Sequence, residues 1–429
     1  MRAGLEQAVE SGRVILAEPR FIGAVTTASI GAAVCAFLLR HTIGWPGMIG
    51  VLAGLTVLTS ASIVARWRAI GWRGLLPVSL LLFLGWAGLS ILWSEYRWAT
   101  VGGLAYLGCF TVLGLYIALL RDTIQIVRSF GDVLRFTLGL SIIVEVVAGA
   151  LLDSPISFLR VGGNLDELGP IQGIMGARNQ LGIVAVFALI TFVIELRTKS
   201  VVRGLAVGSI ALATVTLLLT RSPLAWGAVL VVALAAAALY GIRRVERERR
   251  RILQVVLFIA VTVSASAAWF FRGAIVALFN AGGDLTYRLN VWHEAQALIN
   301  LKPILGWGWI GAWRDDITPF QAFDGLTARS PASASNAFID VWLQLGLVGL
   351  SIFITLVGLT FVRSWLLASR RRTVVYAWPA LMMVALVTTA MGESSILIEF
   401  GWLVLVMCTI KAAQQLSWRA AWTGAEPAG

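Results

Sequence analysis

Long apolar runs, separated by short charged segments and by Gly or Pro breaks, follow one another along most of the chain. Many are about 17 to 25 residues long, the length at which a helix crosses a hydrocarbon core of about 30 Å. The predicted spans lie near residues 22–39, 47–65, 75–93, 100–120, 130–152, 179–195, 204–219, 223–240, 252–271, 336–362, 374–391 and 395–411. The pattern predicts an all-α protein, a polytopic transmembrane helical bundle of about 12 spans. The seventh span is the weakest, and the sequence around Thr220–Pro223 fits either a hairpin or a broken helix.

The composition agrees with a bilayer environment. Hydrophobic residues make up 59% of the 429 residues and charged residues only 13%, whereas soluble domains carry roughly a quarter of their residues as charges. The formal net charge of +12 would suit a nucleic-acid partner. Basic residues of membrane proteins, however, gather in cytoplasmic loops, so we expect the partner to be the lipid bilayer and no nucleic acid to bind.

The Lys and Arg residues predict the orientation of the chain. With the N-terminus inside, 23 of the 34 basic residues fall in inner segments and 10 in outer segments, as the positive-inside tendency requires. We therefore expect residues 1–271 to form spans 1–9, with the N-terminus inside. Residues 272–335 then form one large extracytoplasmic loop containing short helices, and residues 336–429 form spans 10–12 with the C-terminus inside. The expected location is the cytoplasmic (inner) cell membrane.

This orientation makes a labelling prediction. In a chain without its native cysteines, a membrane-impermeant thiol reagent applied to intact cells should label Gly325→Cys and not Arg247→Cys, because the charge asymmetry places residue 247 inside. Permeabilised cells, in which both positions should react, provide the control. Labelling at residue 247 in intact cells would refute the orientation.

The large loop contains a predicted helix. Asp284 is a suitable N-cap, and Pro303 is a suitable end. Mostly apolar residues recur at helical spacing at Leu285, Leu289, Trp292, Gln296 and Ile299. We expect this helix to lie against the bundle or in the interface. The following Gly306–Trp309 segment is typical of a turn, with its tryptophans as anchors at headgroup depth.

Several charged residues lie where charge is unexpected. Four outer arginines fall at turns or re-entry points, and a single one of them is most simply a snorkelling anchor for a helix end. A convergent cluster has a second interpretation, because the planar guanidinium binds phosphate oxygens in a bidentate way. The four are Arg178, Arg221, Arg288 and Arg329. Glu145 and Glu399 lie within or at the edge of apolar runs, where either a function or a polar neighbour would explain them.

Four motifs appear in order between about residues 176 and 350. They are Arg178-Asn179-Gln180-Leu181-Gly182, Thr220-Arg221-Ser222, the pair Asp284–Trp292 and Lys302–Gly308, and Ser335–Asp340 leading into Leu345–Gly349. Together they resemble the O-antigen ligase/polymerase family. Its large-loop signature has an Arg, a Trp a few residues on, then Pro and a Gly-aromatic-Gly turn. The helix count and the single large outer loop also fit.

The resemblance implies a metal-independent glycosyltransferase without a cofactor, a polysaccharide polymerase or a ligase. It would move a glycan from a polyprenyl-diphosphate carrier to a sugar hydroxyl on a glycan acceptor, on the extracytoplasmic side. Carried over residue by residue, the resemblance makes Arg221 and Arg288 catalytic, as a clamp for the leaving diphosphate. The substrate-binding residues would be Arg178, Asn179, Trp292, His293, Ser335 and Asn336.

The chain departs from the family at one position. Ser335 stands where the family commonly has a histidine before Asn336, and a serine hydroxyl cannot act as a general base near neutral pH. Either the base lies elsewhere or the reaction depends on activation of the leaving group alone. Substitutes on the predicted outer side are His293, Asp284, Asp315, Asp340 and Glu393.

Two other function classes remain open from the sequence. A transporter or flippase for lipid-linked sugars would suit about twelve helices. Carriers built from two halves, however, show internal repeats, and none is visible here. A scaffold in a cell-envelope assembly is the third class.

Overall fold

The computed structural model describes residues 16–68, 77–164, 169–245, 282–323, 331–371 and 373–415, with six isolated positions besides. The described part is helical, and it contains no strand beyond one isolated bridge between Ile156 and Val161. The α-helices are α2 (Pro19–Val34), α3 (Ala36–Ala65), α4 (Val78–Leu89), α5 (Arg97–Leu120), α6 (Thr123–Val146), α7 (Arg178–Thr198), α8 (Arg203–Thr220), α9 (Pro223–Arg244), α12 (Gly282–Leu301), α13 (Ala337–Arg370), α14 (Ala377–Ala390) and α15 (Glu399–Gln415).

The helices confirm the predicted fold class. Seven described helices are long and apolar enough to cross a membrane, namely α3, α5, α6 with its π-helical extension to Leu151, α7, α8, α9 and α13. Large apolar side chains such as Leu82, Leu230 and Ile354 are half exposed or more on the outside of the bundle, as lipid-facing positions are. The protein is therefore a polytopic membrane protein. The count of about twelve spans stays a prediction, and the span predicted at 252–271 lies outside the described residues.

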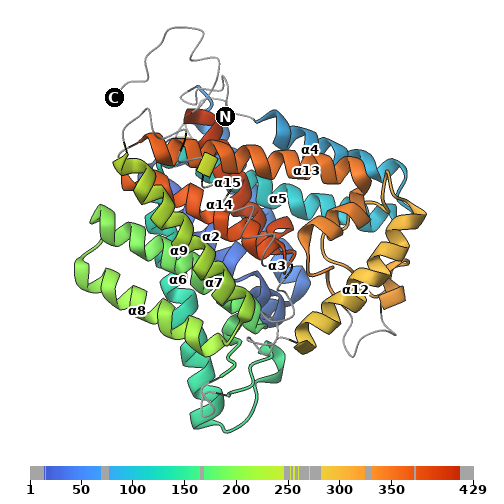
Figure 1. Cartoon of the computed structure of the whole chain (residues 1–429), viewed down its shortest axis with the longest axis horizontal. Coiled ribbons are helices and arrows are strands. Elements are labelled where there is room, and N and C mark those ends of the chain that lie inside the picture. Colours follow the sequence, from blue (N-terminus) through green and yellow to red (C-terminus); the bar gives the residue numbers. More distant parts are fainter. Residues whose placement is uncertain are drawn as a thin grey trace, which may run out of the picture.

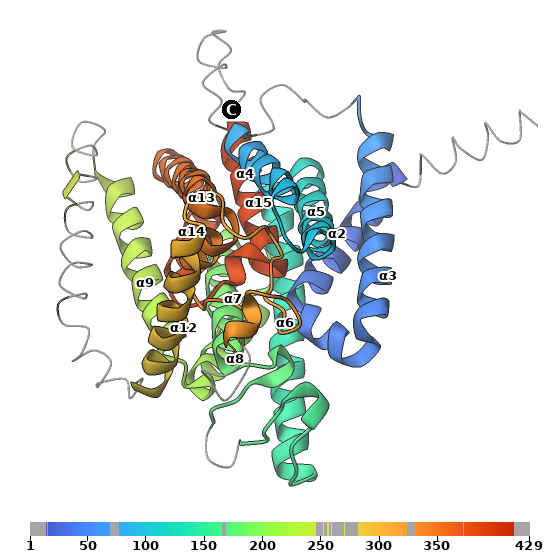
Figure 2. The ribbon, with the colours of Figure 1, turned by 90° about the vertical axis from the view of Figure 1, so that its right-hand side faces the viewer.

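The interior of the bundle is formed by α7, α14 and α15. Helix α7 is the most enclosed of the seven long helices, and it packs against α6, α8, α9 and α14. Helices α14 and α15 lie at the centre of the view in Figure 1, with α8 and α9 on one side and α12 on the other. In the turned view of Figure 2, α12 lies toward the viewer, and the segment that follows α6 projects at one end of the bundle.

The weak seventh span is one arm of a helical hairpin. Helix α8 ends at Thr220, Arg221 adopts a left-handed backbone with φ 44°, and α9 begins at Pro223. The Ser222 hydroxyl caps α9 by accepting a hydrogen bond of 3.3 Å from the backbone N–H of Ala225. Proline at the first helical position and a serine N-cap both favour a helix start. The structure thus selects the hairpin from the two alternatives.

Helix α12 corrects two details of the predicted loop helix. It begins at Gly282, so Asp284 lies inside its first turn and does not cap it. Its buried face is formed by Val291, Ala295, Leu298 and Ile299, whereas Leu289 is half exposed. The sequence spacing placed the apolar stripe one position away, because it ignored Val291 and Ala295. Helix α12 packs on α13, as expected of a helix that lies against the bundle.

A backbone contact joins the turn after α12 to a break in α13. Helix α13 is interrupted at Gly346, where φ is 68°. The Leu343 and Gln344 carbonyls therefore lack helical partners, and they accept hydrogen bonds from the N–H groups of Trp307 (3.0 Å) and Gly308 (2.8 Å). On the other side of the break, the Leu347 N–H donates to the Pro303 carbonyl at 2.9 Å. We call this contact the glycine seam (residues 303–308 on 343–347).

The seam also places the tryptophans of the turn inside the protein. Trp309 is fully buried and Trp307 nearly so, and the Trp309 ring packs edge-on against Phe83 of α4. Both side chains therefore anchor the loop inside the protein. The reason is the seam, which turns the chain inward at this point.

Candidate functional site

The side chain of Arg288, in the first half of α12, forms an ion pair with Glu393. Its Nη2 lies 3.3 Å from Glu393 Oε1, and both side chains are about 15% exposed. Its Nη1 donates to the Ser335 carbonyl at 3.0 Å and to the Gly392 carbonyl. The guanidinium therefore bridges the chain before α13 and the chain after α14. Of its five N–H donors, three are used by these contacts within the described part of the chain.

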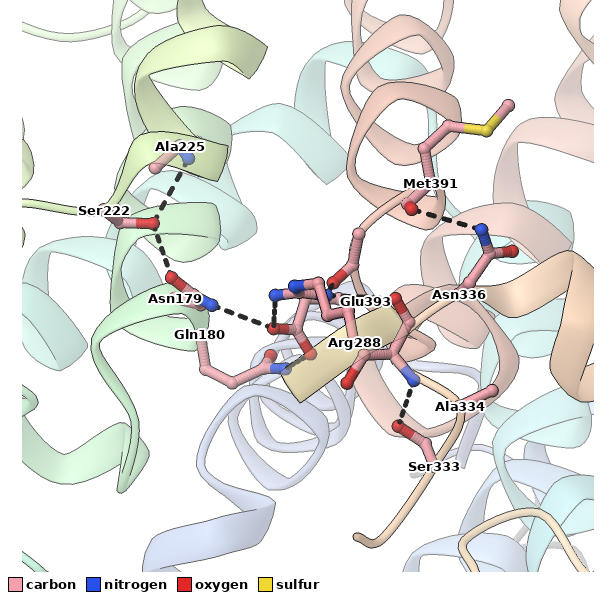
Figure 3. Close-up of polar contacts among 12 residues, drawn as sticks. Asn179, Gln180, Ser222, Ala225, Arg288, Ser333, Ala334, Asn336, Met391 and Glu393 are labelled. Atoms are coloured by element: carbon pink, nitrogen blue, oxygen red, sulfur yellow. Dashed lines mark hydrogen bonds and ion pairs between the residues drawn. The ribbon is translucent and has the colours of Figure 1, made fainter. Parts of the chain in front are cut away.

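Glu393 also accepts hydrogen bonds from two side chains of α7, and one of these is bonded to the α8–α9 turn. Its Oε1 also accepts a hydrogen bond from Asn179 Nδ2 at 3.0 Å, and its Oε2 accepts one from Gln180 Nε2 at 3.5 Å. The Ser222 hydroxyl in turn donates to Asn179 Oδ1 at 2.8 Å. Figure 3 shows these side chains pointing toward one another. We call Asn179, Gln180, Ser222, Arg288 and Glu393 the polar cluster.

The polar cluster forms because helix ends converge there. Its members come from the start of α7, the α8–α9 turn, α12 and the segment after α14. Gly182 allows the α7–α9 approach, since an added Cβ would lie only 2.6 Å from the Ala225 Cβ. Helix ends carry free backbone groups that need polar partners, so this end of the bundle can hold a buried polar network.

The segment before α13 contains two of the predicted site residues and is contacted by a third, Trp292 of α12. Asn336 caps α13 by accepting from the N–H groups of Phe338 (3.0 Å) and Ile339 (3.3 Å), and its Nδ2 donates to the Met391 carbonyl at 3.2 Å. Ser335 has a left-handed backbone with φ 48°. Trp292, one helical turn after Arg288, donates from Nε1 to the Ala334 carbonyl at 2.8 Å. Arg288 and Trp292 therefore fix this segment together.

The remaining predicted site residues lie at or near the same end. Arg178 is the first residue of α7, directly before Asn179. Arg221 is exposed at the α8–α9 turn and precedes Ser222. His293 is exposed on α12. It follows Arg288 by five residues and therefore lies on a different face of the helix. Arg329 lies outside the described residues.

The other acidic residues considered as bases differ strongly in environment. Asp340 is fully buried and accepts from Trp313 Nε1 (2.6 Å), Gln344 Nε2 (3.0 Å) and the Ala334 N–H (3.2 Å). These contacts tie α13 to the segment before it and to Trp313. Asp315 is exposed, and the side chain of Asp284 lies outside the described part.

The two glutamates of the apolar runs have polar neighbours. Glu145 Oε1 accepts from the backbone N–H groups of Gln172 (2.7 Å) and Gly173 (2.8 Å), so it fixes the segment before α7. Glu399 pairs with Arg40 and accepts from the Tyr106 hydroxyl at 2.8 Å. These contacts tie α15 to α3 and α5. They favour the structural interpretation of both residues.

Sequence reasoning missed the position of Glu393 at the centre of the site. It named this residue only among several substitutes for a base, and it did not single out Gln180 or Ser222. The Ser222-Pro223 pair is a helix-start signal and could have indicated a fixed turn. No signal in the sequence joins residues 179, 288 and 393, since only the packing of the helices brings them together. Within the described ranges, no three His, Cys, Asp or Glu side chains gather as a metal site would need.

A comparison with known families agrees with the resemblance seen in the motifs. Residues 208–354 match the family described as O-Antigen ligase, a stretch that contains Arg221, Arg288 and the glycine seam. Asn179 and Glu393 lie outside the matched stretch. No curated protein sequence matches the chain. The chain is thus a helical membrane protein whose residues 208–354 are similar to the O-antigen ligase family. This similarity supports, in general terms, a role in membrane glycan ligation or polymerisation.

Proposed function

We propose that this protein transfers a glycan from a polyprenyl-diphosphate carrier to a sugar hydroxyl on an acceptor chain, at the extracytoplasmic face of the inner membrane. The observation that carries the proposal is the placement of Arg288. It lies in the family-matched region and is held in the polar cluster at a convergence of helix ends. A guanidinium held in place among converging helix ends could bind the anionic diphosphate of a lipid carrier.

The leaving group explains why a fixed arginine is needed. When the bond between the sugar and the diphosphate breaks, negative charge grows on the diphosphate, and positioned donors that meet this charge supply a large part of catalysis. Three contacts hold the Arg288 guanidinium. Within the described residues, two of its five N–H donors then remain for phosphate oxygens.

Arg221 is our second member of the diphosphate clamp. It follows α8 at the turn whose next residue, Ser222, is bonded to Asn179 of the polar cluster. The chain of contacts from Ser222 through Asn179 and Glu393 reaches Arg288. A diphosphate bound between the two arginines would therefore lie beside the polar cluster.

The other predicted residues have proposed supporting roles. Asn336 and Trp292 fix the segment before α13 through hydrogen bonds to backbone carbonyls, so they would shape the site and not take part in bond making. Asn179 would position Glu393. Arg178 would be a weaker third cation for the diphosphate. His293 and Ser335 would contact the glycan.

The experiment that tests the function is transfer by purified protein. The protein in detergent, supplied with a polyprenyl-diphosphate-linked glycan and an acceptor glycan, should form a longer glycan product in the presence of EDTA. We expect no metal requirement because arginines can neutralise the leaving diphosphate. Chromatography of the released glycan and of the free carrier diphosphate measures the reaction.

Two outcomes would contradict the proposal. Activity that disappears with EDTA and returns with Mg²⁺ would refute the metal-independent mechanism. Protein in vesicles that moves the carrier across the bilayer with its glycan unchanged would indicate a flippase. The Arg314→Ala variant is a suitable control for a general loss of loop charge, because Arg314 is largely exposed and pairs with its neighbour Asp316.

A further inference from the structure

Transfer of a glycan to a hydroxyl group requires a destination for the hydroxyl proton. We propose that Glu393 is this destination, as the general base that activates the acceptor. The inference rests on the proposed function, since it concerns the same site and the same bond. It assigns a catalytic role to a residue 39 positions after the end of the family-matched stretch at residue 354.

The two oxygens of Glu393 have different partners. Oε1 is held by Asn179 at 3.0 Å and by Arg288 at 3.3 Å. Oε2 accepts only from Gln180 at 3.5 Å in the described part of the chain, and a hydrogen bond of this length is weak. A carboxylate oxygen has two lone pairs, so Oε2 retains the capacity to accept from a substrate hydroxyl. The side chain is 16% exposed, which allows a ligand to reach it.

The other groups near the cluster are poorer bases. Asp340 is fully buried and its carboxylate is occupied by three donors. His293 is exposed and lies off the Arg288 face of α12. Ser335 has a hydroxyl, which is not basic near neutral pH. Glu393 is the carboxylate that contacts the arginine of the site.

Proton transfer to Glu393 accompanies formation of the new glycosidic bond. The acceptor O–H bond breaks and its proton moves to Glu393 Oε2. The hydroxyl oxygen bonds to the anomeric carbon of the donor sugar, and the bond from that carbon to the diphosphate oxygen breaks. The electron pair leaves with the lipid diphosphate, opposite Arg288. The proton later passes from Glu393 to solvent or to the released diphosphate.

The ion pair couples donor binding to this step. A diphosphate that binds Arg288 competes with Glu393 for the guanidinium, because both are anionic. The carboxylate keeps its place when that contact weakens, since Asn179 and Gln180 still hold it, and Ser222 holds Asn179. Donor binding would thus loosen the contact of Oε1 with Arg288 while Oε2 stays in place to accept the proton of the acceptor.

Variants of Glu393 in the full-length purified protein test the proposal. Glu393→Gln keeps the shape of the side chain and removes its basicity. We expect transfer to fall by about 10²–10⁴-fold, the usual contribution of a general base, with the Kd for the polyprenyl-diphosphate-linked glycan changed only a few-fold. Transfer by Glu393→Ala should be partly restored by added formate, which can replace the missing carboxylate. Asp316→Asn, which neutralises a carboxylate of the large loop outside the polar cluster, is the matched control.

The outcomes separate this inference from the proposed function. If Glu393→Gln keeps transfer within tenfold of the unsubstituted protein, Glu393 is not the base. Loss of donor binding in proportion to the lost rate, without rescue by formate, would also overturn the proposal and leave Glu393 as a positioning residue for Arg288. Failure of the proposed function would appear earlier, as absence of transfer by the unsubstituted protein, and would overturn both.

Discussion

Replacing Arg288 with alanine should reduce glycan transfer by about 10²–10³-fold, equivalent to roughly 2.7–4 kcal/mol of transition-state stabilisation. The reason is its position, since the guanidinium is held by Glu393 and by the carbonyls of Ser335 and Gly392 at the proposed diphosphate site. Arg288→Lys should be almost as damaging, because an ammonium group cannot reproduce the planar fork that binds two oxygens at once. The rate of product formation at equal protein amounts is the measurement.

The same experiment should include Arg221. Arg221→Ala should also lower the rate strongly, and the double variant should lose less than the product of the two single effects, because both arginines act on one diphosphate. Ser335→Ala should be much milder. Near-wild-type polymer from Arg288→Ala at equal expression would defeat the account. So would an experimental structure that places the two guanidinium groups on opposite sides of the bundle.

Replacing Gly346 with alanine should strongly destabilise the fold. Its φ of 68° is a left-handed conformation, which costs a non-glycine residue of order 1–3 kcal/mol. An added Cβ would also overlap the Ile304 carbonyl across the glycine seam, and relief of such overpacking costs about 1–3 kcal/mol more. We expect a lower yield of folded protein and an apparent melting temperature in detergent lower by several degrees.

Helix α13 supplies a matched control. A Cβ added at Gly358 would meet open space, and alanine is a better helix former than glycine, so Gly358→Ala should keep or raise the melting temperature. Equal melting temperatures for the two variants would show that the seam is not rigid. Transfer activity should follow folded yield for Gly346→Ala, because the seam carries the loop and does not touch the reacting atoms.

The sequence predicts the helices well, because the bilayer imposes a simple length and composition on each of them. Most apolar runs described by the structure lie on helices near their predicted limits, but α3 begins at Ala36 instead of near residue 47, and α13 continues to Arg370 instead of ending near residue 362. The register of α12 is less well predicted. A helix in the large loop is partly covered by protein and partly exposed, so its apolar stripe is ambiguous. Leu289 is exposed for this reason, although its spacing places it on the predicted face.

The candidate site is likewise predicted only in part by the sequence. Arg288 stands out in the sequence as a basic residue kept on the predicted outer side, and Asn336 stands out as a helix start, which it is. The partnership of Arg288 with Glu393 spans 105 residues, and no local pattern encodes it. The break at Gly346 is hidden for a related reason, since the free carbonyls are satisfied by a turn about 35 residues earlier. Such contacts depend on tertiary packing alone.

The glycine seam has a consequence for protein engineering. Residues 303–308 and 343–347 share hydrogen bonds that would otherwise lie within α13, so the loop and the first part of that helix are one interchangeable module. A chimaera that exchanges only the loop would bring a foreign turn against Gly346, whose neighbours leave no room for a different backbone path. Exchanging residues 303–347 as a block keeps both halves of the contact from the same parent. Grafts intended to alter glycan selectivity should therefore have their boundaries before Pro303 and after Leu347.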